Sequence, residues 1–411
     1  MFEMMIVGRW DSVKRHGRYA AVFLIMMMTA GLLSGCTTFE NFREAFIDKP
    51  QEDSSTVTIG VYEPMTGADS SAGEQEIEGI ELANELYPNV DGKMVELVYA
   101  DNASDIYAAE TAIKELISKE PDVILGSYGS VYSLVAADYI NEAEIPSIAI
   151  TNTNPLVTAN NEYYFRVCYV DSDQGDLLAR YVLEYKKETT AGIMIPEEND
   201  ASMEMATAFS DRIKAETGNE DAITVYEQYA PGAEDFTDHL KIIRDSGVGS
   251  VLLAGSVNDC ANVIKQADKM GLNVQFLGDT SWSEKKFKKL AGGASAAENA
   301  AFVNFFVSDD IVNEESQKFL DAYHEKHGAN SIPEDAVALG YDAYVIAVDA
   351  IEEAGTDASG KEIRDILAGQ KQFHGASGII TFNNIGDPIK TSFIGSWDGN
   401  QVVSIYTLDP I

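Results

Sequence analysis

Histidine and cysteine, the residues that most often supply metal ligands and nucleophiles, are scarce in this chain. Its 411 residues include five histidines and three cysteines. The signatures of a nucleophile elbow, a zinc protease and a phosphate-binding loop are missing (G-x-S-x-G, H-E-x-x-H and G-x-x-x-x-G-K-[ST]). His324 and His327 are spaced for one helix face, but no cysteine or third ligand lies near them in the sequence. We therefore expect no metal, no cofactor and no enzymatic activity.

Basic residues are also few, since 29 lysines and arginines stand against 67 aspartates and glutamates, for a net charge of −38. Such an acidic surface repels phosphate backbones, so nucleic acid is not an expected partner. Hydrophobic residues make up 45% of the chain and charged residues 23%. At this length, the balance predicts a globular protein of two or more domains.

The apolar run near the N-terminus, residues 20–33, is too short for a comfortable membrane span. Lys14, Arg15 and Arg18 precede the run, and the tetrapeptide L-S-G-C ends it at Cys36. A basic region, an apolar core and a final cysteine in this order resemble the signal of bacterial lipoproteins.

That resemblance implies three features. Residues 1–35 would be a cleaved signal peptide, and Cys36 would carry a lipid as the first residue of the mature chain. Residues 36–55, which are polar and contain a proline, would form a tether between the lipid and the folded protein. The protein would then be extracytoplasmic and anchored to the cell membrane.

After residue 55, short β-rich runs alternate with amphipathic helical patterns, which predicts parallel sheets covered by helices on both faces. The alternation begins once near the start and restarts near residue 191, so we predict an α/β protein of two doubly wound lobes. Cys168 and Cys260 are expected to be separate buried thiols. The strand-like runs lie at 57–62, 94–100, 122–128, 146–151, 191–196, 222–229, 250–256 and 274–280.

Several segments match a known pattern in the correct order. They include P-M-T-G with a following G-I-E-L-A, T-N-T-N-P, R-V-C-Y-V-D-S-D-Q-G and L-G-D-T-S-W, and they lie at 60–86, 151–155, 166–175, 235–255, 277–282 and 340–343. Over roughly residues 57–400, the chain thereby resembles the leucine/isoleucine/valine-binding branch of the type I periplasmic-binding fold.

The resemblance implies two parallel-sheet lobes that are joined by three hinge crossovers and hold a ligand between them. The D-S-D-Q-G segment lies where the first crossover is expected. We predict that lobe 1 comprises 56–171 plus 302–378. Lobe 2 is predicted to comprise 172–301 plus 379–411.

Residues 122–135 indicate a ligand site on physical grounds. A strand-like run ends before Gly129, which permits a tight turn, and Ser130 stands where a helix N-cap belongs. Ligands of open α/β sheets bind at the carboxyl ends of strands, and a helix start favours a carboxylate. A plain helix cap without a ligand is the alternative. In the family that the chain resembles, the residue at Ser130 binds the carboxylate of the ligand.

The resemblance also assigns roles to three further residues. Thr153 aligns with a threonine that contacts the head group, and Asn152 with a residue whose backbone carbonyl accepts the ligand ammonium. Asp279 stands near the position at which the family has an acidic residue that pairs with this ammonium. An N-cap for the following helix is the alternative role of Asp279.

The aromatic residues that cover the ligand in the family are replaced by Ala72 and Ala201. Tyr128 could substitute for them from the neighbouring loop, and otherwise the pocket is roomier or more polar than a leucine site. An amino acid or a related small polar metabolite is therefore the expected ligand, with a neutral amide as an alternative.

The expected function is that of the substrate-binding lipoprotein of an ABC importer, whose partner is a membrane permease. Two alternatives from other classes remain. A sensory lipoprotein would use the same pocket but signal to a receptor. An exported enzyme would need a nucleophile and base that no motif reveals.

The lipoprotein signal predicts how the protein is anchored. Replacing Cys36 with alanine should release the protein from membranes, because the acylated sulfur is lost. Membrane fractionation after a high-salt wash measures this, and a Cys36→Ala protein that stays with the membrane would refute the anchor. Ligand should make no difference to the result.

Overall fold

The computed structural model describes residues 56–408, apart from the side chains of Ala294 and Ser295. The predicted signal peptide (1–35) and tether (36–55), with Cys36, lie outside the described residues and stay predictions. The three sheets described below belong to one compact unit of the chain, Thr56–Ile411.

The first sheet has six strands in the order β2-β3-β1-β4-β5-β6, and only the β2–β3 pair is antiparallel. Alternate residues of β4 enter different cores, with Val123 and Leu125 on one face and Ile124 on the other. This pattern explains why the strand is apolar throughout. The strands are β1 (Val57–Glu63), β2 (Asn89–Val90), β3 (Lys93–Asp101), β4 (Val123–Gly126), β5 (Ser147–Ala149) and β6 (Tyr164–Arg166).

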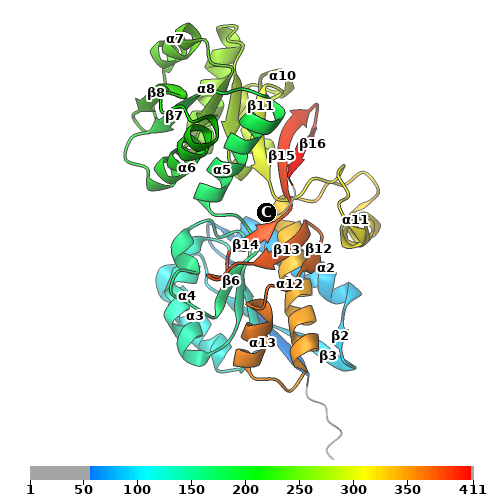
Figure 1. Cartoon of the computed structure of the whole chain (residues 1–411). Coiled ribbons are helices and arrows are strands. Elements are labelled where there is room, and N and C mark those ends of the chain that lie inside the picture. Colours follow the sequence, from blue (N-terminus) through cyan, green and yellow to red (C-terminus); the bar gives the residue numbers. More distant parts are fainter. Residues whose placement is uncertain (1–55, 409–411) are drawn as a thin grey trace, which may run out of the picture. The chain divides into compact units, whose positions relative to one another are not determined.

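Helices cover both faces of this sheet (Figure 1). On one face lie α3 (Ile106–Ile117) and α4 (Ser130–Ala143). On the other lie α2 (Ser70–Leu86), α12 (Asp335–Ala354) and α13 (Gly360–Leu367). The helix α11 (Glu314–His327) packs beside α2.

The second sheet has seven strands in the order β16-β15-β11-β10-β9-β7-β8, and β15 pairs antiparallel with both of its neighbours. Its strands are β7 (Ala191–Pro196), β8 (Ile223–Tyr229), β9 (Ser250–Leu253), β10 (Gln275–Gly278), β11 (Ala300–Asn304), β15 (Ser392–Asp398) and β16 (Gln401–Leu408). The two faces pack against α5 (Asp171–Arg180) with α6 (Asp200–Thr217), and against α7 (Thr237–Ser246), α8 (Val257–Lys269) and α9 (Lys285–Ala291). Parallel sheets with helices on both faces confirm the predicted α/β fold.

A three-stranded sheet, β12-β13-β14, lies in the chain directly before β15, where the chain enters the second sheet for the last time. Its strands are Phe373–Gly375, Gly378–Phe382 and Pro388–Lys390. Because β14 pairs with β13, the chain enters the second sheet at Ser392 rather than at residue 379. The predicted division at 301/302 likewise falls inside β11, which pairs with β10.

The three crossover segments meet in one cluster. The Tyr169 ring stacks on Phe305 with 5.7 Å between centroids, and its hydroxyl donates to the Thr391 carbonyl at 2.7 Å. Lys390 is only 3% exposed, and its ammonium donates to the Val167 carbonyl at 3.2 Å. Burial lowers the pKa of Lys390. The segments that join the two sheets are therefore fixed to one another by aromatic and polar contacts.

Both cysteines of the described chain are free and buried, which confirms the expected separate thiols. Cys168 lies next to the first crossover, and Cys260 lies in α8. Burial is the main cause that raises the pKa of the Cys168 thiol to about 12. Such a thiol behaves as a small apolar side chain rather than as a nucleophile.

The contact of α2 with α12 depends on glycine. A Cβ atom placed on Gly79 would lie 2.0 Å from the Val337 carbonyl oxygen, and one on Gly340 would lie 2.2 Å from the Glu76 carbonyl oxygen. Each helix thus presents a glycine to the backbone of the other, which allows a close approach that fixes the position of α2 on the first sheet.

This close approach predicts that Gly79→Ala destabilises the protein by about 1–3 kcal/mol or more, because the added methyl forces the helices apart. Urea unfolding followed by circular dichroism measures the effect. Gly369→Ala is the matched control, since this exposed glycine keeps a Cβ position 3.1 Å from its nearest neighbour. Equal losses in both variants would contradict the proposed role of the α2–α12 contact.

Candidate functional site

A cavity of about 640 Å³ lies at the carboxyl ends of strands of the first sheet. From that side it is lined by Tyr128, which follows β4, by Thr151 and Thr153, which follow β5, and by the start of α2. From the second sheet it is lined by residues between Thr280 and Lys286, which follow β10. Strand ends of both sheets therefore meet at one cavity, the position at which open α/β sheets bind ligands.

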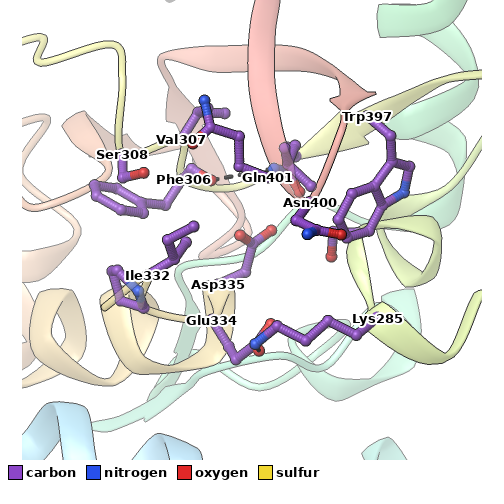
Figure 2. Close-up of a pocket in the computed structure, with 14 residues that line it drawn as sticks. Lys285, Phe306, Val307, Ser308, Ile332, Glu334, Asp335, Trp397, Asn400 and Gln401 are labelled. Carbon is purple, nitrogen blue, oxygen red and sulfur yellow. Dashed lines mark hydrogen bonds and ion pairs between the residues drawn. The ribbon is translucent and has the colours of Figure 1, made fainter. Parts of the chain in front are cut away.

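A smaller cavity of about 40 Å³ shares Ser283, Lys285, Glu334 and Asp335 with the larger one. Figure 2 shows the Asp335 carboxylate among its lining residues, with Lys285 and Glu334 reaching toward each other below it. The Lys285–Glu334 ion pair measures 3.0 Å. Asp335 accepts a hydrogen bond from the Phe305 amide at 3.0 Å, and burial raises its pKa to about 7.

The start of α4 differs by one residue from the prediction, which placed Ser130 at the N-cap, and no side chain caps the helix. Gly129 is the N-cap residue with φ of 84°, a conformation that favours glycine, and the helix begins at Ser130. The Ser130 hydroxyl oxygen accepts from the Asn154 amide at 3.4 Å, so the first side chain of the helix faces the loop after β5. Gly129 and Ser130 are both half-buried and follow Tyr128 directly. Unlike Tyr128, neither belongs to the described residues that line the cavity.

Thr153 lines the cavity, whereas its neighbour Asn152 is fully buried below it. The Asn152 side chain accepts from the Ser133 hydroxyl at 2.8 Å and donates to the Ser127 carbonyl at 2.8 Å. Its backbone carbonyl accepts from Arg166 at 2.7 Å. The Asn152 carbonyl was predicted to accept a hydrogen bond from the ligand. In the structure, one of its two lone pairs already accepts from the Arg166 guanidinium.

Arg166, a residue to which the sequence assigned no role of its own, organises the loop that carries Thr153. Its guanidinium also donates to the carbonyls of Asn154 at 2.8 Å and Pro155 at 3.2 Å. It forms an ion pair of 2.6 Å with Asp387, and its side chain is 0% exposed. A charged side chain can be buried in this way because both terminal nitrogens of the guanidinium are hydrogen-bonded and its charge is paired with Asp387.

Asp279 is the N-cap of the short helix Thr280–Ser283, where it accepts from the Ser281 amide at 2.9 Å. Asp279 is half-buried, and burial raises its pKa. Its charge also acts on Asp171, whose pKa burial and Asp279 together raise to about 7. A hydrogen bond from Thr153 lowers the pKa of Asp171 and ties it to the site. Two acids, one at the start of α5 and one after β10, thus lie close enough near Thr153 for the charge of one to raise the pKa of the other.

The sequence offered a signal for Asp171, because it opens the D-S-D-Q-G segment. Of the two residues that replace the expected aromatics, Ala72 lines the cavity, and Ala201 is an exposed residue of α6. Within residues 56–408, no cluster of three or more potential ligands could hold a metal ion. The same part of the chain has no helix with both the length and the hydrophobicity of a membrane span.

Comparison with known proteins places these features in a family. The sequence profile of the family described as "Periplasmic binding protein" matches residues 56–401. The "Leu/Ile/Val-binding protein homolog 3" of Brucella melitensis is 26% identical over 357 residues, which are 85% of this chain and 93% of that protein.

Solved structures are similar as well. A leucine binding protein from Thermotoga maritima is 29% identical, with a TM-score of 0.71 over 86% of this chain and 99% of its own. A solute binding protein of an ABC transporter from R. palustris, solved in complex with benzoate, is 20% identical. Its TM-score is 0.68 over 87% of this chain and 97% of its own, so it shares the fold.

The Arg166 network predicts a large stability effect. Arg166→Met should lower the free energy of unfolding by about 3–5 kcal/mol, because Asp387 and three loop carbonyls lose their buried partner. Denaturant unfolding measures this. Lys241→Met is the control, since the Lys241–Asp238 pair is exposed (50% and 91%) and should contribute less than about 1 kcal/mol. A small effect at Arg166 would mean that water replaces the guanidinium.

Proposed function

The chain belongs to the family of periplasmic binding proteins, and from this premise we propose that it is the substrate-binding component of an ABC importer. The observation that carries the proposal is the 640 Å³ cavity lined by strand ends of both sheets. A ligand held there would contact both lobes at once and favour the form in which they close. The membrane permease would then recognise that form.

We propose an amino acid as the ligand because of the charges around the cavity. Its lining contains four carboxyl groups, Asp69, Glu284, Glu334 and Asp335, against Lys285 and Lys286. Lys285 already pairs with Glu334. An aromatic carboxylate such as benzoate would bring only negative charge to this lining. An amino acid brings an ammonium as well. The relatives of this chain also include proteins named for binding leucine, isoleucine and valine.

Within this site, the ligand carboxylate is proposed to lie at the start of α4, near Gly129 and Ser130, because free N–H groups at a helix start favour an anion. Thr153 and Tyr128 would contact the ligand from the cavity wall. The Asn152 carbonyl and Asp279 would lie on the ammonium side. Asp171, which accepts from Thr153, would add a second negative charge there.

We further propose that the protein acts outside the cytoplasm and is anchored by a lipid on Cys36. The L-S-G-C tetrapeptide after a short apolar run supports the anchor. The family supports an extracytoplasmic location. The polar residues 36–55 would place the binding unit at a distance from the membrane surface.

The proposal predicts that L-leucine or L-isoleucine binds and that specific side chains matter. Ser130→Ala should cost about 1–3 kcal/mol of binding free energy, because a charged acceptor loses a donor. Asp279→Asn should cost at least as much, because the ammonium loses its counter-charge. Titration calorimetry on purified protein, after unfolding and refolding to remove copurified ligand, measures both.

Asp238→Asn serves as the matched control, since Asp238 is an exposed residue of helix α7. Near-wild-type affinity in the Ser130 and Asp279 variants would show that the amino acid is held elsewhere. Binding of benzoate without binding of any amino acid would refute the amino-acid assignment while leaving the solute-binding role intact.

A further inference from the structure

Two glutamates are completely buried directly below the candidate site. Glu63 ends β1 and Glu76 lies in α2, and both are 0% exposed. Two ionised carboxylates cannot share such a place, because burial and mutual repulsion both disfavour the second charge. The pair needs either a cation or a proton.

The hydrogen bonds of the pair are complete with a single proton. One Glu63 oxygen, Oε2, accepts from the Tyr128 amide at 2.7 Å, and Glu76 Oε1 accepts from the Thr151 hydroxyl. The remaining oxygens, Glu63 Oε1 and Glu76 Oε2, are buried and have no hydrogen-bond partner among the described residues. Besides burial, which raises the pKa of both groups, a hydrogen bond between the two side chains, with the proton on Glu63, acts to raise the pKa of Glu63 and to lower that of Glu76. A proton on Glu63 Oε1 that is donated to Glu76 Oε2 satisfies all four oxygens.

Among the described residues, no lysine, arginine or histidine interacts with the pair strongly enough to shift its pKa values. The titratable groups that interact with it are Tyr62, Tyr128, Tyr164 and Cys168, from β1, from the loop after β4 and from β6 and the segment after it. Helix α12 meets Glu76 at Gly340, which has no side chain. Burial raises the pKa of Glu76 to about 7, and burial with the Glu76 charge raises that of Glu63 well above its usual range.

We propose that Glu63 and Glu76 are positioning residues of the ligand site, in which one shared proton fixes the Tyr128 amide and the Thr151 hydroxyl. Both Tyr128 and Thr151 line the 640 Å³ cavity, from neighbouring strand ends. The inference rests on the proposed solute-binding function. Loss of the proton would place two charges side by side and separate the two wall segments that they hold.

The direction of the pH dependence follows from the proton count. A free glutamate has a pKa of about 4.3. Above that pH, the buried Glu63–Glu76 pair of the folded protein keeps a proton that the same glutamates release in the unfolded chain. The contribution of the pair to stability is therefore present at low pH and is lost as the pH rises through the raised pKa. Ligand affinity should fall only as the pH passes the raised pKa, because below it the folded protein keeps the proton whether or not ligand is bound.

The test compares the wild type with Glu63→Gln, in which an amide N–H replaces the shared proton permanently. We measure urea unfolding and L-leucine binding from about pH 6 to about pH 8.5. In the wild type, both should weaken with rising pH, the affinity by up to about tenfold per pH unit, because one proton is linked. In Glu63→Gln, both slopes should be reduced. Acids such as Asp171 and Asp335 titrate in both proteins, so the difference isolates the pair.

Glu315→Gln is the control, since this half-buried glutamate accepts hydrogen bonds from Tyr87 and Tyr341, none of these three residues lines the cavity, and the variant should keep the wild-type slopes. Identical unfolding slopes in wild type and Glu63→Gln would overturn the shared proton. Different unfolding slopes with identical leucine slopes would overturn the positioning role. If no variant binds leucine at any pH, the proposed ligand fails, while the unfolding slopes still decide the shared proton. Should Glu63→Gln not fold, Glu76→Gln gives the same replacement from the other side.

Discussion

The candidate site depends on one buried guanidinium. The loop after β5 has little regular structure, so its carbonyl groups must find donors outside a helix or sheet. Arg166 supplies these donors to Asn152, Asn154 and Pro155, and balances its own charge with Asp387. A lysine has neither the five donors nor the planar geometry to do this. The position of Thr153 in the cavity wall is a consequence.

The same contact connects the site to the crossovers. Asp387 immediately precedes β14, and β14 ends at Lys390, whose ammonium lies 5.9 Å from the ring centroids of both Tyr169 and Phe305. The loop after β5 is thus connected through two side chains to the place where all three crossovers meet. If the lobes close on a ligand as proposed, they would bend about this cluster, because its aromatic and polar contacts leave little freedom within it.

The features that could be predicted from the sequence are local ones. Gly129 and Ser130 follow a strand-like run, and turn and capping preferences are sufficient to place the start of α4 to within one residue. For Asp279, the sequence permitted both a ligand contact and a helix cap, and the structure shows the cap. The predicted boundaries near 302 and 379 differ from the strands because pairing of β11 and β14 depends on partners distant in sequence.

Buried charge was the least predictable feature. Glu76 follows Gly73 by three residues and precedes Ile80 by four, so it lies on the buried face of α2, a spacing that could have revealed it. Its partner Glu63 ends a strand, and nothing in the sequence indicates that the two side chains meet. Arg166 was equally hidden, because a lone arginine after an apolar strand is usually exposed.

Two half-buried acids, Asp171 and Asp335, determine how the site would interact with a cationic group. Burial raises the pKa values of Asp171 and Asp335 to about 7, so near neutral pH each is poised between a neutral and a charged form. A ligand ammonium would stabilise the charged form of such acids, and it would gain more from them than from fully ionised, hydrated carboxylates at the surface. The Glu63–Glu76 pair is fully buried and does not line the cavity, so a ligand ammonium cannot reach it, and in the proposal a shared proton neutralises it instead. In a chain with a net charge of −38, the two groups of acids thus differ in what neutralises them. A ligand ammonium would do so for Asp171 and Asp335, and a shared proton for Glu63 and Glu76.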